Sequence, residues 1–234
     1  MIQGPSVNTL IGHRSAIPES AAQAADLLQV AETLTVTEAE GPGRRFAVWV
    51  QGCPLRCPGC CNPEMLPFRG GRPVPVGRLL REIRRAAEQH GIEGVTLLGG
   101  EPFAQAAGAA TLAEGVQRRG LTVIVFTGYT LEKLRAMRDR AVDELLSHTD
   151  VLVDGPYVEE LPETRRRWIG SANQRVNFLT DRCRPDDPCW QSPNSLEIRL
   201  RGGELSVNGF PARAASGLWK RVRPLSRWTR TEGA

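Results

Sequence analysis

The sequence predicts an α/β fold in which parallel strands alternate with helices. Short apolar runs suited to buried strands take turns with segments whose apolar residues recur at helical spacing. This order implies right-handed crossovers and a parallel sheet. In addition, polar or glycine residues follow directly after several of these runs, where parallel sheets carry their functional groups. The length of 234 residues suits one domain with additions at its ends.

The first part of the chain predicts an arm, a short helix and two strands. Residues 1–20 mix Gly, Pro, Ser and Asn without a sustained period, which is typical of a loosely attached arm. A short helix is predicted over 21–28 and a strand over 31–39. A turn rich in Gly and Pro at 40–44 leads to a continuous apolar strand at 46–50, and such a run favours burial on both faces.

The alternation of strands and helices continues to residue 154. Residues 63–75 are rich in Pro and Gly and predict an irregular connection. Thr130 is the predicted N-cap of one helix. The predicted helices are 76–90, 103–118, 131–137 and 141–147, and the predicted strands are 94–98, 121–126 and 151–153.

The end of the chain predicts an addition to this alternation. A strand over 174–179 and a polar loop over 180–194 precede two alternating segments around Arg201-Gly202-Gly203, which predict a β-hairpin. We expect four parts: an N-terminal arm over 1–28, a main domain over 29–180, an extension with loop and hairpin over 181–220, and a flexible basic tail over 221–234.

Composition limits the classes of partner. The net charge of +4 is too small to argue for nucleic acid. No apolar run approaches the roughly 18 residues of a membrane span, and the first residues lack the features of a signal peptide. We therefore expect a cytoplasmic protein without nucleic-acid or membrane partners. In that compartment thiols stay reduced and can bind metal.

Three cysteines with the spacing Cys53-x3-Cys57-x2-Cys60 follow the apolar strand at 46–50. Three thiolates on one loop can bind a metal or an iron–sulfur cluster. A four-iron cluster normally takes four cysteines, so three leave one iron open for chemistry. One alternative is a structural zinc site with Cys183 and Cys189 as further ligands, and another is chance clustering of buried cysteines.

The remaining cysteines are weaker candidates. Cys61 adjoins Cys60, and two adjacent residues rarely bind one metal, so a small loop side chain is the better interpretation. Cys183 and Cys189 are interpreted as unpaired or weakly structural, and an auxiliary metal site is the less favoured alternative.

Other candidates also follow predicted strands: Gly99-Gly100-Glu101, Thr127 and Asp154. A glycine pair lets the backbone approach a ligand and exposes N–H groups, and a carboxylate can accept hydrogen bonds from an ammonium. Taken singly, Thr127 and Asp154 suit caps of helices or turns. Because strand ends of a parallel sheet share one edge, we expect all of these groups near the cysteine loop.

Two further sets of polar residues carry no assigned chemistry. His13, His90 and His148 stand in ordinary polar settings and receive no role. The run Arg165-Arg166-Arg167 suits a solvated surface, with an acidic partner surface as the alternative.

Together these motifs resemble the radical S-adenosylmethionine (SAM) enzymes, and among them the activating proteins of anaerobic ribonucleotide reductase and glycyl-radical enzymes. The resemblance runs from about Glu40 to Asn177. It rests on Cys53-x3-Cys57-x2-Cys60, Cys57-Pro58-Gly59-Cys60 followed by Asn62, Gly41-Pro42-Gly43-x-Arg45, Gly99-Gly100-Glu101, Thr127-Gly128-Tyr129, the segment from Asp150 to Gly155, and Gly170-Ser171-Ala172-Asn173-Gln174.

The resemblance implies a partial (β/α)6 barrel of the TIM type, with the C-terminal β-hairpin as an extension. It implies a [4Fe–4S] cluster on Cys53, Cys57 and Cys60, with SAM on the open iron. No side chain need act as acid or base, because the cofactors carry the chemistry. The implied SAM-binding residues are Gly59, Cys61, Gly99, Gly100, Glu101, Thr127 and Asp154.

The function implied by the resemblance is reductive cleavage of SAM to methionine and a 5′-deoxyadenosyl radical, which takes a hydrogen atom from a substrate. The expected partner is a larger glycyl-radical protein, foremost an anaerobic ribonucleotide reductase, with flavodoxin or ferredoxin as electron donor. One alternative is a radical SAM enzyme that modifies a peptide or small molecule. Another is a non-catalytic metal-binding module.

The chain departs from the activating proteins in several places. Gly59 stands where many of them carry an aromatic residue, and Pro156 stands nearest to where some carry a lysine that contacts SAM. The additions at both ends lie outside the small activating-protein core. These departures bear on the identity of the partner more than on the reaction.

Overall fold

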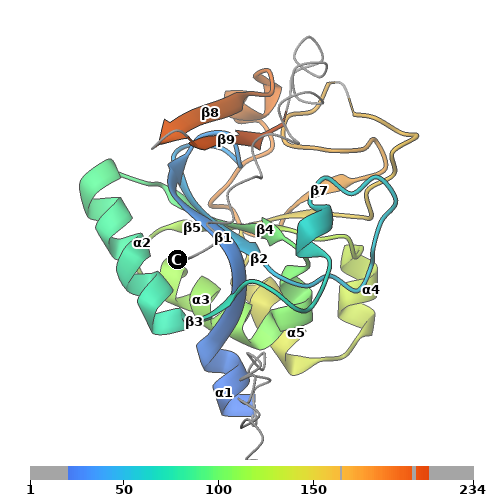
Figure 1. Cartoon of the computed structure of the whole chain (residues 1–234). Helices are drawn as coiled ribbons and strands as arrows, with labels where there is room; N and C mark the ends of the chain where they lie inside the picture. The colour runs from blue at the N-terminus through green and yellow to red at the C-terminus, as the bar shows by residue number, and fades with distance from the viewer. Residues whose placement is uncertain (1–20, 164, 202–203, 211–234) are drawn as a thin grey trace, which may run out of the picture.

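A computed structural model describes residues 21–163, 165–201 and 204–210 of the chain. The predicted arm over 1–20 and the predicted tail over 221–234 lie outside the described residues. The described part forms an α/β structure with one large mixed sheet and a separate hairpin (Figure 1). Among the described residues, no helix combines the length and the apolar character that crossing a membrane requires.

The large sheet has parallel strands in its middle and antiparallel strands at its edges. The strand order is β3-β1-β2-β4-β5-β6-β7. Parallel pairing joins β2 to β4, β4 to β5 and β5 to β6, while β1, β3 and β7 join by antiparallel pairing. The strands are β1 (Leu27–Thr37), β2 (Arg45–Val50), β3 (Arg72–Pro75), β4 (Gly94–Gly99), β5 (Thr122–Phe126), β6 (Val151–Asp154) and β7 (Arg175–Phe178).

The α/β prediction with parallel strands is confirmed, but the described sheet is not closed: β3 and β7 are its two edges. The antiparallel pairs arise from the connections. β1 enters β2 through the turn at 38–44, and β7 follows β6 without an α-helix in the described residues between them, so neither pair is joined by a helical crossover. Pro73 and Pro75 suit the edge position of β3, because proline cannot donate to a second neighbour.

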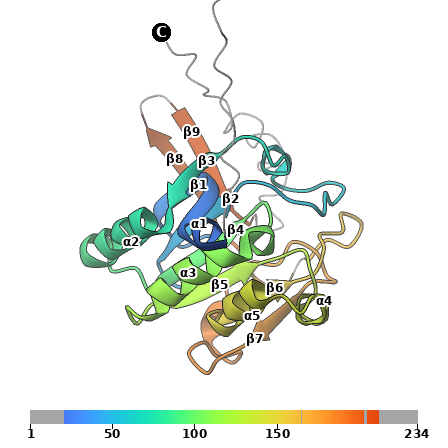
Figure 2. The ribbon, with the colours of Figure 1, turned by 90° about the horizontal axis from the view of Figure 1, so that it is seen from below.

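Helices cover one face of this sheet. Figures 1 and 2 show α2, α3 and α5 side by side beneath the strands. The α-helices are α1 (Ala21–Asp26), α2 (Val76–His90), α3 (Ala106–Gln117), α4 (Leu131–Ala136) and α5 (Arg140–Ser147), and the 3-10 helices are η1 (Pro63–Met65), η2 (Pro102–Gln105) and η3 (Pro188–Gln191). The main apolar core lies between the helices and the sheet.

Most predicted elements match in position, and the differences have local causes. Helix α2 has the predicted bounds, because Leu79, Ile83 and Ala86 repeat at helical spacing on its buried face. The helix predicted over 103–118 is divided into η2 and α3. The connection predicted to be irregular over 63–75 contains η1 and β3.

The opposite face of the sheet has no α-helix over it in the described part of the chain. A smaller apolar cluster on this face contains Ala47, Trp49, Met65 and Leu98. The hairpin of β8 (Leu196–Arg201) and β9 (Glu204–Gly209) lies on this side (Figure 1). Its Asn208 amide donates to Thr37 Oγ1 at 3.0 Å and to Glu40 Oε1 at 3.2 Å, which attaches the hairpin to the end of β1.

Candidate functional site

The cysteine loop begins where β2 ends, and backbone hydrogen bonds hold both ends of the loop together. Gly52 N donates to Met65 O at 2.8 Å, and Cys53 N donates to Leu66 O at 3.0 Å. The Gln51 side chain also donates to backbone carbonyls near the end of the loop. The loop over 51–67 is therefore a closed turn of chain attached to the C-terminal end of a buried parallel strand.

The three motif cysteines differ in exposure. Cys53 is buried, with 7% of its surface exposed, whereas Cys57 and Cys60 are half-buried, and no disulfide joins any of the three. Burial raises the pKa of the Cys53 thiol, and hydrogen bonds from the backbone N–H groups of Arg56 and Leu55 oppose this shift. The backbone N–H groups around Cys53 thus offset part of the effect of burial on its pKa.

The residues present fit an iron–sulfur cluster. Three thiols stand on one short loop, and backbone N–H groups donate to the sulfur of Cys53 and, from Asn62 at 3.4 Å, to the sulfur of Cys60. Hydrogen bonds to sulfur are one of the means by which proteins tune such clusters. Among the described residues, no three His, Cys, Asp or Glu side chains gather around one ion. An iron–sulfur cluster does not require three side chains around one ion, because each thiolate binds a different iron atom.

The end of β4 lies against the start of the cysteine loop. Gly100 N donates to Val50 O at 2.8 Å, and Glu101 N donates to Gly52 O at 2.9 Å. A side chain at Gly100 would place its Cβ 2.4 Å from Gly52 O. Glycine at this position is therefore required by the neighbouring backbone. The sequence had instead predicted that glycine here allows a ligand to approach. The close contact with Gly52 also brings Glu101 beside the cysteine loop.

Glu101 is a fully buried carboxylate with neutral partners. It accepts hydrogen bonds from Phe103 N at 2.9 Å, Gly128 N at 2.9 Å and the Thr127 hydroxyl at 2.9 and 3.0 Å. Burial raises the pKa of Glu101 to about 7 in spite of these bonds. An ionised carboxylate has about four acceptor sites. The three donors, Phe103 N, Gly128 N and the Thr127 hydroxyl, therefore leave room for one more, and an N–H group of a ligand suits it.

The end of β5 completes this side of the site. Thr127 is buried, and its hydroxyl donates to Glu101 while accepting from Tyr129 N at 3.1 Å. A Cβ at Gly128 would lie 2.5 Å from Leu55 Cδ1, so the turn after β5 contacts the cysteine loop. The charges of Glu101 and Cys53 add to burial in raising the pKa of Tyr129. The structure thus brings three strand ends together, as predicted.

Asp154, at the end of β6, is also fully buried, but it forms an ion pair with Arg175. Arg175 Nε donates to Asp154 Oδ1 at 3.0 Å, and Leu131 N donates to Asp154 Oδ2 at 2.6 Å. Arg175 also binds Glu132, and this contact lowers the pKa of Glu132 to about 2. Asp154 therefore joins β7 and the start of α4 to the rim. Its predicted contact with SAM stays a prediction.

The remaining predicted site residues lie on the cysteine loop. Gly59 has a positive φ of 67° and lies against the Glu159 carboxylate, and Cys61 is exposed. The loop after β6 therefore reaches the third motif cysteine. Their contacts with SAM also stay predictions. Sequence reasoning named Tyr129 in a motif without giving it a role, and it missed Arg175, because both act through tertiary contacts with residues distant in the chain.

Cys183 and Cys189 lie in the loop after β7, away from the motif. Both are free and half-buried. Burial raises the pKa of both thiols, to about 12 for Cys189, where a hydrogen bond with Asp187 adds to the effect. Both therefore stay protonated at neutral pH and are poor nucleophiles.

A three-cysteine loop on the rim of an α/β sheet, beside a buried carboxylate, defines an iron–sulfur protein of the α/β class. Residues 39–177 match the family model described as a 4Fe-4S single cluster domain. The match covers more than half of the chain, and the chain belongs to this family.

Curated relatives extend this assignment. Each of three is named anaerobic ribonucleoside-triphosphate reductase-activating protein. The relative from Escherichia coli K12 is 31% identical over 147 residues, 59% of this chain and 91% of its own. The relative from Enterobacteria phage T4 is 32% identical over 145 residues, which are 60% of this chain and 88% of its own. The relative from Salmonella typhimurium is 33% identical over 147 residues, 59% and 91%.

Among solved structures, QueE from Escherichia coli aligns with 44% of this chain and 54% of its own, with a TM-score of 0.36 and 19% identity, which is too low to compare the folds. The relatives and the family match confirm the predicted class. The chain is a radical SAM enzyme of the activating type, and its cofactors are a [4Fe–4S] cluster and SAM.

Proposed function

We propose that the chain activates an anaerobic ribonucleoside-triphosphate reductase by installing a glycyl radical on it. The names of the relatives, which this chain matches over about nine-tenths of their length, support this target. The observation that carries the proposal is the contact between the three-cysteine loop and Glu101 at one rim of the sheet.

In this proposal Cys53, Cys57 and Cys60 hold the cluster and leave one iron for SAM. Once bound and reduced, the cluster would supply the electron for cleavage of SAM to methionine and a 5′-deoxyadenosyl radical, which would take a hydrogen atom from the partner. The chain's own residues orient SAM and shield the reaction from solvent. Glu101 accepts a hydrogen bond from the amino group of SAM, and the hydroxyl of Thr127 fixes the direction of the carboxylate.

The other proposed SAM contacts surround these residues. Gly59 and Cys61, beside the third cysteine, would lie near the adenine, and the backbone of Gly99 and Gly100 would border the methionine part. We also propose that the strand ends serve as the rim of a partial (β/α)6 barrel. Asp154 shapes this rim through Arg175 and the start of α4.

The setting of the reaction is part of the proposal. We propose a cytoplasmic location, because reduced thiols are needed to load the cluster. Flavodoxin or ferredoxin is the proposed electron donor, and the proposed partners include neither nucleic acid nor membrane. We also propose that residues 29–180 act as the catalytic domain and 181–220 as an extension.

A second candidate function keeps the chemistry and changes the target to a peptide or small molecule. The observation that favours it is the segment after residue 177, where the family match ends and where the structure has a loop and the β8–β9 hairpin. A neighbouring gene for a short precursor peptide would favour this candidate. A neighbouring gene for a glycyl-radical reductase would favour the first.

The test is anaerobic activation of the reductase encoded in the same genome. The reconstituted and reduced protein is mixed with SAM and the reductase, and the glycyl radical is measured by electron paramagnetic resonance together with reductase activity. We expect both signals with the natural protein and neither with Cys53→Ala. A variant with Cys183→Ala and Cys189→Ala serves as the matched control and should keep both. Cleavage of SAM without a radical on the reductase would reject the proposed target.

A further inference from the structure

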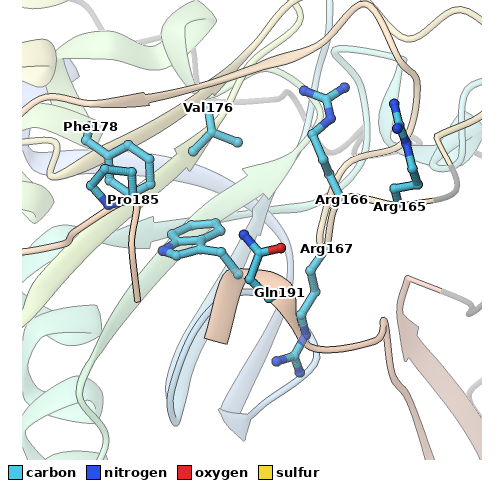
Figure 3. A pocket seen from close by; sticks show the side chains of 8 residues that line it. Arg165, Arg166, Arg167, Val176, Phe178, Pro185 and Gln191 are labelled. Atoms are coloured by element: carbon cyan, nitrogen blue, oxygen red, sulfur yellow. The ribbon is translucent and has the colours of Figure 1, made fainter. Parts of the chain in front are cut away.

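A cavity of about 390 Å³ lies beside the edge strand β7 (Figure 3). Its volume falls in the range of small-molecule sites, about 300–1,000 Å³. Neither the proposed cluster nor the proposed SAM contacts use the residues that line it. These residues are Arg165, Arg166, Arg167, Val176, Phe178, Pro185, Trp190 and Gln191.

The cavity lies on the face of the sheet opposite α2, α3 and α5. Val176 pairs with Val153, whereas the neighbouring Leu152 belongs to the core under the helices. Because side chains alternate along a strand, Val176 and Phe178 face the opposite side. β4, β5 and β6 separate β7 from β2, so the cavity lies roughly 19 Å across the sheet from the strand that leads to the cysteine loop.

One wall of the cavity is a fixed aromatic platform. Trp190 meets the ring of Phe178 edge to face at 5.2 Å and meets the ring of Trp168 in the same way at 5.1 Å. Trp168 is almost fully buried, and the guanidinium of Arg167 lies 4.1 Å from its ring centre. The indole of Trp190 is thus held by packing on two sides. A rigid aromatic surface of this kind suits a planar ring, and every nucleobase offers one.

The other wall carries positive charge. Figure 3 shows Phe178 and Pro185 on one side of the cavity and the three arginine side chains on the other. Arg166 is anchored, because its guanidinium donates to Gln174 O at 2.7 Å and to Ala172 O at 2.9 Å and pairs with Glu163.

Arg165 differs from Arg166. Arg165 is exposed, and among the described residues its guanidinium makes no hydrogen bond or ion pair. It therefore offers five donors in the wall of the cavity, in the fork geometry that matches phosphate oxygens. Arg166 adds a second positive charge in the same wall.

We propose that this cavity binds a nucleoside phosphate, with the base against Trp190 and Phe178 and the phosphate at Arg165. A single aromatic platform in a bounded cavity fits one planar ring with one anionic group better than it fits an extended acidic peptide. Phe178, Pro185, Trp190 and Gln191 follow residue 177, where the family match ends, so half of the residues that line the cavity lie beyond the family match. The inference goes beyond the proposed function, since binding requires no SAM cleavage.

The experiment measures nucleotide binding to the reconstituted protein before reduction, with SAM in excess. Saturating SAM keeps the probes out of the SAM site. ATP and GTP are the probes, with adenosine and inorganic tripolyphosphate as half-ligands, and binding is measured by equilibrium dialysis. We expect ATP or GTP to bind more tightly than either half-ligand. Arg165→Ala should weaken binding about tenfold or more, as loss of a charged hydrogen-bond donor does.

Variants at the platform and a matched control complete the experiment. Trp190→Ala should weaken binding by about tenfold, in line with the loss of one base stack. Trp190→Phe keeps a ring and should stay near the natural affinity, which separates loss of stacking from loss of folding. Arg184→Ala is the control, because Arg184 is an exposed arginine of the same loop that pairs with Asp186.

Several results would overturn the inference. One is the absence of binding by ATP and GTP at about 1 mM. Another is tripolyphosphate binding as tightly as ATP and with no effect of Trp190→Ala, which would define an anion site without base recognition. A third is nucleotide binding that neither Arg165→Ala nor Trp190→Ala changes. None of these results depends on SAM cleavage or on activation of the reductase.

Discussion

The ends of strands β4 and β6 each place a fully buried carboxylate on the same rim, and the two carboxylates are satisfied in opposite ways. Glu101 accepts hydrogen bonds from neutral donors, and burial raises its pKa to about 7. Asp154 is paired with Arg175, which itself is shared with Glu132. Both groups are 0% exposed, so burial alone does not separate them. The two carboxylates differ in the charge of their partners, which are neutral for Glu101 and cationic for Asp154.

The difference separates a residue that holds the fold from one suited to a ligand. Asp154 attaches β7 and the start of α4 to the rim, and its charge is compensated inside the chain. Glu101 is held in a fixed direction by Thr127 and Gly128, and among the described residues no ion pair includes it. A buried carboxylate with a raised pKa beside a metal-binding motif is typical of functional sites.

The glycines at the two strand ends give the largest expected contrast. A methyl group at Gly100 would lie 2.4 Å from Gly52 O, and backbone atoms cannot move aside easily. Gly155 has a φ of 107° and its nearest atom stands 3.5 Å away. We expect Gly100→Ala to cost about 3 kcal/mol or more of unfolding free energy, and Gly155→Ala about 1–2 kcal/mol from backbone strain alone.

Urea unfolding of both glycine variants measures this contrast. Gly100→Ala should also lower the iron content after reconstitution, because the cysteine loop would be displaced. Equal destabilisation by the two substitutions would show that the close contact between Gly100 and Gly52 does not position the loop.

Removal of the cation beside Asp154 is the next largest effect. Arg175→Met leaves a buried charge without its partner and should cost roughly 3 kcal/mol, the low end for a broken buried pair, because 46% of the Arg175 side chain is exposed. Arg140→Met is the matched control, since this arginine of α5 is 92% exposed and should cost less than about 0.5 kcal/mol. The measurement is again urea unfolding, and similar losses in both variants would refute a structural role for Asp154.

Replacement of each carboxylate by its amide tests the ligand side of the comparison. Glu101→Gln should weaken SAM binding to the reconstituted protein about tenfold or more, because a charged hydrogen bond to the amino group is lost. Asp154→Asn should change SAM affinity less and stability more. Glu40→Gln is a control at the other end of the strands, since Glu40 is also buried with a pKa raised to about 8.

Equilibrium dialysis with labelled SAM provides the readout for these amide variants. An equal loss of affinity in Glu101→Gln and Asp154→Asn would show that Asp154 contacts SAM directly, as its strand-end position first suggested. A loss in Glu40→Gln of the same size would mean that the effect is not local to the rim.

The smallest expected effect concerns the pH dependence of SAM binding. Glu101 accepts a hydrogen bond best when ionised, so affinity should rise as the pH passes through about 7. The Thr127 hydroxyl lowers the pKa of Glu101, and its loss in Thr127→Val should raise that pKa and shift the midpoint to higher pH. The midpoint is read from SAM affinity measured between about pH 6 and 9. A midpoint that stays in place would remove Thr127 from this role.

The parallel strands and their strand-end motifs were predictable because both depend on local pattern. β4 and α2 appear where period and apolar runs predicted them, and the rim follows from the rule that parallel strands end at one edge. Thr130 caps α4 as predicted, accepting a hydrogen bond from Lys133 N.

The edges and the charge partners were not predictable in this way. β3 was missed because two prolines in four residues weaken every strand pattern, and only pairing with β1 forms it. Arg175 reaches Asp154 because β7 pairs with β6 in an antiparallel register, which no local pattern encodes. The need for glycine at position 100 likewise comes from a residue distant in the chain, because the carbonyl of Gly52 leaves no room for a side chain.

The most direct test of the central claim is to count iron and 5′-deoxyadenosine in three proteins after anaerobic reconstitution and reduction with SAM. The natural chain and the variant with Cys183→Ala and Cys189→Ala should each hold about four irons and form 5′-deoxyadenosine. The variant with Cys53→Ala, Cys57→Ala and Cys60→Ala should do neither. A cluster that survives loss of the loop cysteines, or that requires Cys183 and Cys189, would contradict a radical SAM site on this rim.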